Sequence, residues 1–248
     1  MQLKKLALAA SAFTAAAALS TAASAAGSFG VQYFEVPSNH GGDFGVCCSS
    51  PPATLPVVPL GSALGPDGLP VTTLTTGPDA VIDQNAAGEI LWWTASPLTG
   101  ITSTGSGSLP LPLSQINMFA PNSTGTNNSQ FFETAILSGK FTGKGATSIT
   151  VASDDDTFVY FDGSFVGGNL GVHGNESSTI NLGSLSGTHS LQVFYADRAQ
   201  TGADLAITGV GLDTLSGAPE PATWAMMLVG FGGLGAMLRS KRRMAATA

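Results

Sequence analysis

The stretch SITVASDDDTFVYFDG, from Ser148 to Gly163, decides the fold of this 248-residue chain. Its apolar run Thr157–Phe161 (TFVYF) puts two aromatic rings on one face of an extended chain, and a valine and a phenylalanine on the other. A strand that is apolar on both faces is typical of the middle of a sheet that is covered on both sides. The sequence therefore predicts a central core strand at Thr157–Phe161.

Turn and strand signals surround this predicted strand. Asp162 and Gly163 tolerate the positive φ angles of a tight hairpin, which predicts a return strand at Ser164–Val166. The preceding run Ser148–Ala152 (SITVA) indicates another short strand. Helical periodicity is missing between the two ends of the chain, so the predicted class is all-β: a sandwich formed by a single domain over residues 26–217.

Three consecutive carboxylates, Asp154, Asp155 and Asp156, lie at the mouth of the central strand. They repel one another unless water or a cation screens them, and Ca²⁺ takes hard oxygen ligands of this kind at loops. The spacing is not that of an EF-hand, because the glycine at loop position six and the distal glutamate are missing. Two interpretations stay open here: a solvated turn in which Asp caps a strand end, and a Ca²⁺ site.

Three runs around this turn resemble the fibro-slime domain: ASDDDTFVYFDGSFV at Ala152–Val166, GGNLGVHG at Gly167–Gly174, and the segment Ser178–Thr208. That family is similar to the protective-antigen-like lectin domains of flocculins and adhesins. The resemblance implies an antiparallel β-sandwich of the protective-antigen-like lectin type, with its core at about residues 115–212. It also implies a Ca²⁺-assisted carbohydrate site at the paired acidic residues.

Carried onto this chain, the resemblance implies a Ca²⁺ site formed by Asp154, Asp155 and Asp156 with Asn169 assisting. Asn169 stands where the family usually has an aspartate. Glycines on either side of Asn169 would let backbone carbonyls approach the same ion.

The N-terminus has the form of a secretory signal. Lys4 and Lys5 precede an apolar run that ends at Leu19, and Ala23-Ser24-Ala25 forms an A-x-A cleavage site. The apolar run is short and mostly alanine, whereas a transmembrane helix needs about 20 strongly apolar residues. We expect residues 1–25 to be a signal peptide for export through the Sec pathway.

The C-terminus, residues 218–243, reads APEPATWAMMLVGFGGLGAMLRSKRR. Its apolar part, residues 222–238, would form a helix of about 26 Å, just enough for a hydrocarbon core of about 30 Å. The basic cluster that follows would hold the C-terminus in the cytoplasm. The sequence therefore predicts a transmembrane helix at this end.

This tail closely resembles the PEP-CTERM sorting signal, on the residues Pro219, Glu220, Pro221 and Trp224. The resemblance implies that an exosortase of a Gram-negative bacterium recognises the Pro-Glu-Pro motif and removes the helix. The chain would then be anchored in the inner membrane only transiently, before it reaches the cell surface or the extracellular space.

The charge of the exported part excludes some partners. Of nine basic residues, two lie in the signal and four in the tail, which leaves three, whereas all sixteen acidic residues lie between Glu35 and Glu220. The net charge of the body is therefore about −13, which argues against nucleic acid or anionic lipid as a partner and is compatible with cation binding.

The segment of residues 27–88 is rich in Gly, Pro, Ser and Thr and shows no helical period. Its short apolar pieces, Val31–Val36 and Val81-Ile82, are predicted to be edge strands of the same sandwich. The only cysteines, Cys47-Cys48, could form a strained vicinal disulfide, bond other chains or stay free thiols. Because His40 is the only histidine near them, a zinc site is not predicted.

Further strands are expected along the chain. The run Glu89–Trp93 (EILWW) predicts a strand whose two tryptophans, Trp92 and Trp93, either pack in the core or form an exposed platform for stacking sugar rings. Thr102–Ser108 is predicted to be a flexible loop. Other strands are predicted at Ile116–Ala120, Phe131–Leu137, Lys140–Thr142, Thr179–Leu182, His189–Tyr195 and Asp204–Leu212, with a turn at Gly183–Gly187.

Two function classes follow from these features. The first is a non-catalytic surface or exopolysaccharide-matrix protein, structural or adhesive, that binds glycans with Ca²⁺. The second is an exported hydrolase acting on extracellular polysaccharide, for which a carboxylate pair could be drawn from Glu133, Asp156 and Asp197. No nucleophile elbow and no zincin pattern is present, so we expect the chain not to be an enzyme.

Overall fold

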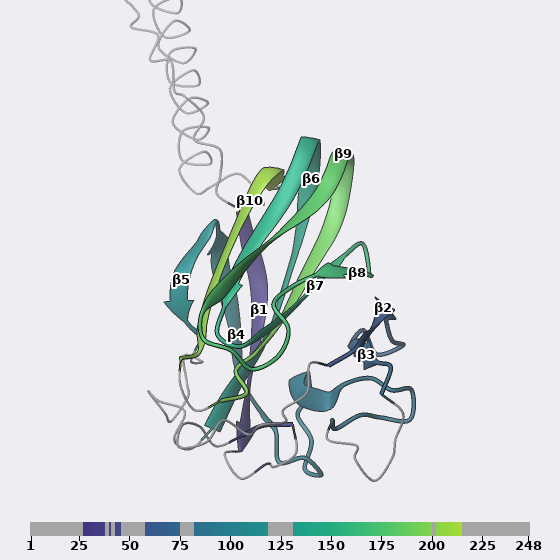
Figure 1. The fold of residues 1–248 in the computed structure, drawn as a ribbon, viewed down its shortest axis with the longest axis vertical. Helices are drawn as coiled ribbons and strands as arrows, with labels where there is room; N and C mark the ends of the chain where they lie inside the picture. The colour runs from purple at the N-terminus through teal and green to yellow at the C-terminus, as the bar shows by residue number, and fades with distance from the viewer. Residues whose placement is uncertain are drawn as a thin grey trace, which may run out of the picture.

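The computed structural model describes residues 27–37, 40, 43–45, 58–74, 82–118, 131–199 and 202–214. Within these residues the fold is a curled antiparallel sheet of ten strands with one short 3₁₀ helix (Figure 1). The elements are β1 (Gly27–Pro37), β2 (Leu60–Leu64), β3 (Pro70–Thr72), η1 (Leu91–Trp93), β4 (Thr102–Leu111), β5 (Leu113–Asn117), β6 (Phe131–Ser153), β7 (Asp156–Phe161), β8 (Ser164–Gly167), β9 (Glu176–Ala196) and β10 (Asp204–Thr214).

The strands follow the order β3-β2-β8-β7-β9-β6-β1-β4, and β10 joins the far half of β6 to β5. The strand β7 lies between β8 and β9, with all six of its residues buried. The turn after β7 has positive φ at both Asp162 (49°) and Gly163 (77°), as a tight hairpin requires. The predicted central strand and its hairpin are confirmed.

Two long strands carry the sheet around on itself. The strands β6 and β9 stay paired from Thr134↔Ala196 to Ser153↔Glu176. The N-terminal half of β6 pairs with β1, whereas its C-terminal half pairs with β10 (Figure 1). Because the two halves face each other, the sheet forms the layers of a sandwich, and the predicted all-β antiparallel sandwich is confirmed.

The bend lies where the sequence predicted breaks between strands. Gly143 pairs with Gly187, and Thr147 pairs with Gly183 beside a register shift. A side chain at Gly143 would come within 2.4 Å of the Leu185 Cβ, so a glycine is needed there. These glycines bend and bulge continuous strands, and the separate strands and the turn predicted for β6 and β9 were wrong in this respect.

The inner core lies between the two layers of the sandwich. It takes alternate residues from both halves of the sheet, as a half-buried strand with a period of two requires. Its buried members are Phe29, Val31, Tyr33, Leu111, Leu113, Met118, Ala135, Leu137, Phe141, Ile149, Val151, Val159, Phe161, Ile180, Leu191, Val193, Tyr195, Leu205 and Ile207.

The outer core lies on the opposite face of β1, β6, β7 and β9. Residues 43–45, 58–74 and 82–101, which carry little regular structure, cover this face. Its buried members are Phe34, Val36, Phe44, Val58, Leu69, Ile82, Ile90, Trp92, Trp93, Ile101, Phe132, Phe158, Tyr160, Phe194 and Ala196. These residues, called the cover from here on, thereby bury the second apolar face of β7.

Three expectations for the first half of the chain were wrong. Val31–Val36 belongs to β1, an internal strand between β4 and β6. The predicted loop Thr102–Ser108 is the strand β4, whose polar side chains face solvent while its backbone pairs with β1. The run Glu89–Trp93 was predicted as a strand, but its last three residues form η1.

Other predictions are met in part or lie outside the described residues. The strand β10 matches the prediction for Asp204–Leu212, and β5 begins and ends earlier than the predicted Ile116–Ala120. The signal peptide, Cys47-Cys48 and the sorting tail lie outside the described residues, and so does Val81. Within the described ranges, no helix has the length and apolarity to cross a membrane.

Candidate functional site

The acidic turn, residues 154–156, connects β6 to β7 at one end of the sheet. Asp155 and Asp156 are fully buried, whereas Asp154 is half-buried, and the peptide bond between Asp154 and Asp155 is cis. Buried carboxylates need hydrogen bonds or opposite charges to offset their desolvation. For Asp155 and Asp156, the interpretation as a solvated turn is therefore wrong.

Asp155 anchors two loops through backbone donors. Its Oδ1 accepts a hydrogen bond from the His173 N–H at 2.8 Å. Its Oδ2 accepts from the N–H groups of Arg198 at 2.8 Å and Ala199 at 2.9 Å. Burial raises the pKa of Asp155, and these backbone bonds oppose that effect by favouring the charged form. One carboxylate thus holds together the loops that follow β8 and β9.

Asp156 is the partner of Arg198, the only arginine in the described residues. The Arg198 Nη1 lies 3.1 Å from Asp156 Oδ2, and both side chains are almost completely shielded from solvent. Asp156 Oδ1 accepts from the Gly171 N–H. Burial raises the pKa of Asp156, while the arginine charge works to lower it. A buried ion pair of this kind is costly to break from one side, at about 3–5 kcal/mol.

Asp154 differs from its two neighbours because part of it reaches solvent. Burial, and after it the charge of Asp155, raises the pKa of Asp154 to about 6. Its carboxylate lies against Gly202, where a Cβ would come within 2.1 Å of Asp154 Oδ2. Its backbone is fixed by Tyr195, whose hydroxyl donates to the Asp154 carbonyl at 2.6 Å. Asp154 therefore lies next to the buried carboxylate of Asp155 and is the one aspartate of the turn that solvent reaches.

Asn169 lies beside the turn but is turned toward other groups. Its Nδ2 donates to Ser153 Oγ at 3.0 Å and to the Glu176 carbonyl at 2.9 Å, and its side chain is buried. The structure thus brings all four predicted metal ligands to one end of the sheet, but it gives Asp155, Asp156 and Asn169 protein partners. Asp154 and Asp155 are adjacent carboxylates, and the charge of Asp155 disfavours ionisation of Asp154.

Trp92 and Trp93 are 0% and 2% exposed, so they have no free face for a sugar ring. Trp92 packs on Phe44 and Phe158, and Trp93 packs on Phe158 and Phe194, with ring centroids 5.1–6.0 Å apart. The Trp93 Nε1 donates to the Tyr195 carbonyl at 2.8 Å. The two tryptophans therefore pack in the core, which was one of the two expectations. The other expectation, an exposed platform for stacking sugar rings, was wrong because both rings fill the outer core.

The carboxylates considered for a hydrolase are all buried: Glu133, Asp156 and Asp197 are 2%, 0% and 0% exposed. Burial, and after it the charge of Asp155, raises the pKa of Asp197 well above its usual range. A general acid and base must reach a substrate from a common cleft. Their burial places these three carboxylates in the packed interior of the protein.

Sequence reasoning did not single out Arg198, which connects the turn to the outer core. Its Nε donates to the Asp43 carbonyl at 2.7 Å, and its guanidinium lies 4.7 Å from the centre of the Trp92 ring. Trp92 in turn donates from Nε1 to Asp43 Oδ2. The sequence feature that could have identified this residue is that Arg198 is one of only three basic residues in a body whose net charge is about −13. A lone arginine among so many acids is a candidate for a buried pair.

A groove of about 470 Å³ lies on the outer face of the sheet, away from the acidic turn. It is lined by Gln32 of β1, Ser138 of β6 and Gln192 of β9, and by the turn at Asp67–Leu69. Amide and hydroxyl groups on a groove floor can hydrogen-bond a polar ligand. The groove is therefore a second place where a ligand could lie.

Residues 218–243 match the family model of the PEP-CTERM protein-sorting motif. This match confirms the sorting signal predicted from Pro219, Glu220, Pro221 and Trp224. The chain is therefore an exported protein whose C-terminal region is a sorting signal for an exosortase. None of the curated proteins matches the chain.

Several solved structures resemble the fold. A PA14 sugar-binding domain from an RTX adhesin is 20% identical over 34% of this chain and 51% of that chain, with a TM-score of 0.28. The A domain of epithelial adhesin 9 from Candida glabrata, in complex with Galβ1-4GlcNAc, is 13% identical over 76% and 84%, with a TM-score of 0.35. A β-glucosidase from Kluyveromyces marxianus, in complex with glucose, is 11% identical over 52% and 15%, with a TM-score of 0.32.

The chain thus spans about half of the RTX adhesin domain. At these identities and TM-scores, the likenesses carry no argument about the ligand or activity of this chain. The geometry of its own residues has to carry that argument.

Proposed function

We propose that the exported body is a non-catalytic protein of the cell surface or exopolysaccharide matrix, which binds glycans at the loops around the acidic turn with the help of Ca²⁺. The observation that carries this proposal is the pair Asp154 and Asp155, held at one end of the sheet between residues 169–173 on one side and residues 197–199 and 202–203 on the other. The resemblance of this turn to the fibro-slime and lectin-type motif supports the same end of the sandwich.

Electrostatics favours a cation at this pair. Two adjacent carboxylates, one fully buried, repel each other, and a divalent ion relieves that repulsion while leaving coordination positions open to sugar hydroxyls. When bound, Ca²⁺ would supply a Lewis-acidic anchor for vicinal hydroxyls. The chain's own contribution is to fix the two loops that would flank the ligand, through the bonds of Asp155 to their backbone.

The route to the surface belongs to the same proposal. The signal peptide would direct the chain through the Sec pathway of a Gram-negative bacterium, and the tail would hold it in the inner membrane until an exosortase cuts near Pro219–Pro221. Intact-mass analysis of protein recovered from the cell surface tests this step. A recovered chain that still carries Arg239–Arg243 would show stable anchoring in place of sorting.

Glycan binding is tested with the exported protein on immobilised exopolysaccharide of the producing cells, with Ca²⁺ or with EGTA. We expect retention that EGTA abolishes and that Asp154→Asn weakens at least about tenfold, because a direct charged ligand is lost. Asp162→Asn is the matched control, since Asp162 is an aspartate at the opposite end of β7.

The outcomes separate the alternatives. Equal retention of Asp154→Asn and wild type would remove the acidic turn as the site. Loss of retention in Gln32→Ala or Gln192→Ala, with Asp154→Asn unaffected, would place the ligand in the sheet groove instead. Release of shortened sugars from the matrix by the wild-type protein would replace the binding proposal with the hydrolase.

A further inference from the structure

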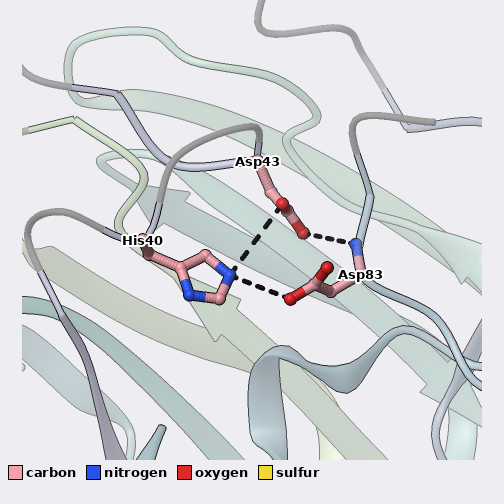
Figure 2. A group of neighbouring side chains, drawn as sticks. All are labelled: His40, Asp43 and Asp83. Carbon is pink, nitrogen blue, oxygen red and sulfur yellow. Dashed lines mark hydrogen bonds and ion pairs between the residues drawn. The ribbon is translucent and has the colours of Figure 1, made fainter. Parts of the chain in front are cut away.

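A second polar cluster, distinct from the acidic turn, is formed by His40, Asp43 and Asp83 (Figure 2). One ligand atom from each side chain lies within 4.8 Å of the other two. His40 Nε2 is 3.1 Å from Asp83 Oδ2 and 4.0 Å from Asp43 Oδ1. Two side chains that are close in sequence, His40 and Asp43, and a third from 40 residues further on, Asp83, therefore point at one common space.

The tautomer of a neutral His40 ring follows from the contact of Nδ1. His40 Nδ1 lies 3.0 Å from the Thr99 carbonyl oxygen, which can only accept, so Nδ1 carries the hydrogen. In the neutral ring, Nε2 then presents its lone pair to the two carboxylates. Histidine ligands of metals have this same arrangement, in which the distant ring N–H is held by a backbone carbonyl.

The Asp43 carboxylate is held in place by two hydrogen bonds to one of its oxygens. Its Oδ2 accepts from the Asp83 N–H at 2.7 Å and from Trp92 Nε1. Its other oxygen, Oδ1, faces His40 at 4.0 Å from Nε2. The Asp43 side chain is only 3% exposed, so a positive charge nearby would offset the cost of burying its carboxylate.

Three electron-rich atoms around one space call for a cation. The His40 and Asp43 side chains are 6% and 3% exposed, whereas Asp83 is 43% exposed, so among these three side chains Asp83 is the one in contact with solvent. An ion could enter there and keep a water ligand in the open position.

We propose that His40, Asp43 and Asp83 form a binding site for a divalent transition metal of the Zn²⁺ type, with the fourth position open to water or an external ligand. Ligand atoms around a tetrahedral zinc, at bonds of about 2.0–2.1 Å, lie roughly 3.3 Å apart. The two separations from Nε2, 3.1 and 4.0 Å, match this value after a small movement of Asp43. An imidazole nitrogen selects against Ca²⁺ and Mg²⁺, which take oxygen ligands.

The site would also tie down the cover of the outer core. Asp43 contacts Trp92 through its side chain and Arg198 through its carbonyl, so a metal at Asp43 would fix the residues that back the acidic turn. Since an ion that binds only the folded state stabilises it, Zn²⁺ is expected to raise the melting temperature.

The test uses the full-length chain in mild detergent, stripped of metal with EDTA and carrying Cys47→Ser and Cys48→Ser in every sample, because thiolates are themselves zinc ligands. Equilibrium dialysis against Zn²⁺ at pH 7.5 is expected to give one ion per chain. Co²⁺ in place of Zn²⁺ is expected to give the intense visible bands of a four-coordinate site.

Asp83→Asn is the decisive variant, because Asp83 is partly exposed and its loss leaves the core packing intact. We expect it to weaken Zn²⁺ binding at least about tenfold, and His40→Gln to abolish binding. His189→Gln is the matched control, since His189 pairs with Asp162 on the surface of the sandwich. No bound Zn²⁺ at 0.1 mM, or equal binding by wild type and Asp83→Asn, would overturn the proposal.

Discussion

The two faces of β7 are buried by different means. On the inner face, Val159 and Phe161 meet strands of the opposite layer, so sheet packs on sheet. On the outer face, Phe158 and Tyr160 meet residues 43–45, 58–74 and 82–101, whose described regular structure is two short strands and one 3₁₀ turn. The inner core is held by a regular alternation along every strand, whereas the outer core is held by a few large aromatic rings.

This difference matters for function because both candidate sites depend on the irregular cover. Arg198 lies just after the end of β9. It pairs with Asp156 of the acidic turn and stacks on Trp92 of the cover. Asp43 accepts from the same Trp92 and belongs to the histidine cluster. The regular layers supply stability, and the aromatic cover positions the charged groups.

The largest effect is expected from Val159→Asp. This change puts a carboxylate without a partner between the two layers, at a position that is 0% exposed, which costs several kcal/mol and should prevent folding. The measurement is far-ultraviolet circular dichroism with a thermal scan. Thr208→Asp, at an exposed position on β10, is the control and should fold normally. A folded Val159→Asp protein would mean that the inner core does not hold the layers together.

An intermediate effect is expected from Trp92→Ala, which tests the outer core. The change empties a site that is 0% exposed and removes the stack on Arg198, so the free energy of unfolding should fall by about 3–5 kcal/mol. Phe141→Ala in the inner core should cost a similar amount. Urea unfolding of both variants makes the comparison. A loss below about 1 kcal/mol for Trp92→Ala alone would show that the cover unfolds separately from the sandwich.

The smallest effect is expected from the pH dependence of Asp154. Burial and the Asp155 charge raise the pKa of Asp154 from near 4 in the unfolded chain to about 6 in the folded protein. The folded state then binds the proton more tightly, so this residue's contribution to stability is full below about pH 4 and is lost as the pH rises through about 6. Solvent at this half-buried side chain screens the effect and keeps it small.

The measurement is the difference in melting temperature between wild type and Asp154→Asn, without added metal, from pH 4 to pH 7. We expect wild type to lose stability relative to the variant as the pH rises. With Ca²⁺ present, the loss should disappear above pH 6, because the ion replaces the proton between Asp154 and Asp155. A difference that stays constant with pH would place the Asp154 carboxylate in ordinary solvent.

Much of the inner core could be predicted from the sequence. The run Thr157–Phe161, the Asp162-Gly163 hairpin and the alternation of Leu191, Val193 and Tyr195 are local patterns, and each is set by the two-residue period of a strand. The sorting motif is likewise contiguous and could be recognised without a fold. Such features need no knowledge of what lies next to them.

Other features were decided by tertiary contacts alone. Glycines in β6 and β9 look like turns in sequence, but pairing over the length of both strands makes them bends. Trp92 and Trp93 are buried in the outer core because the cover folds back on β7. Arg198 pairs with Asp156, which lies 42 residues earlier in the chain. His40, Asp43 and Asp83 meet because the cover brings residues 40 positions apart together. Periodicity reports which face of a strand is apolar, but the identity of its partner depends on closing long loops, which no local pattern encodes.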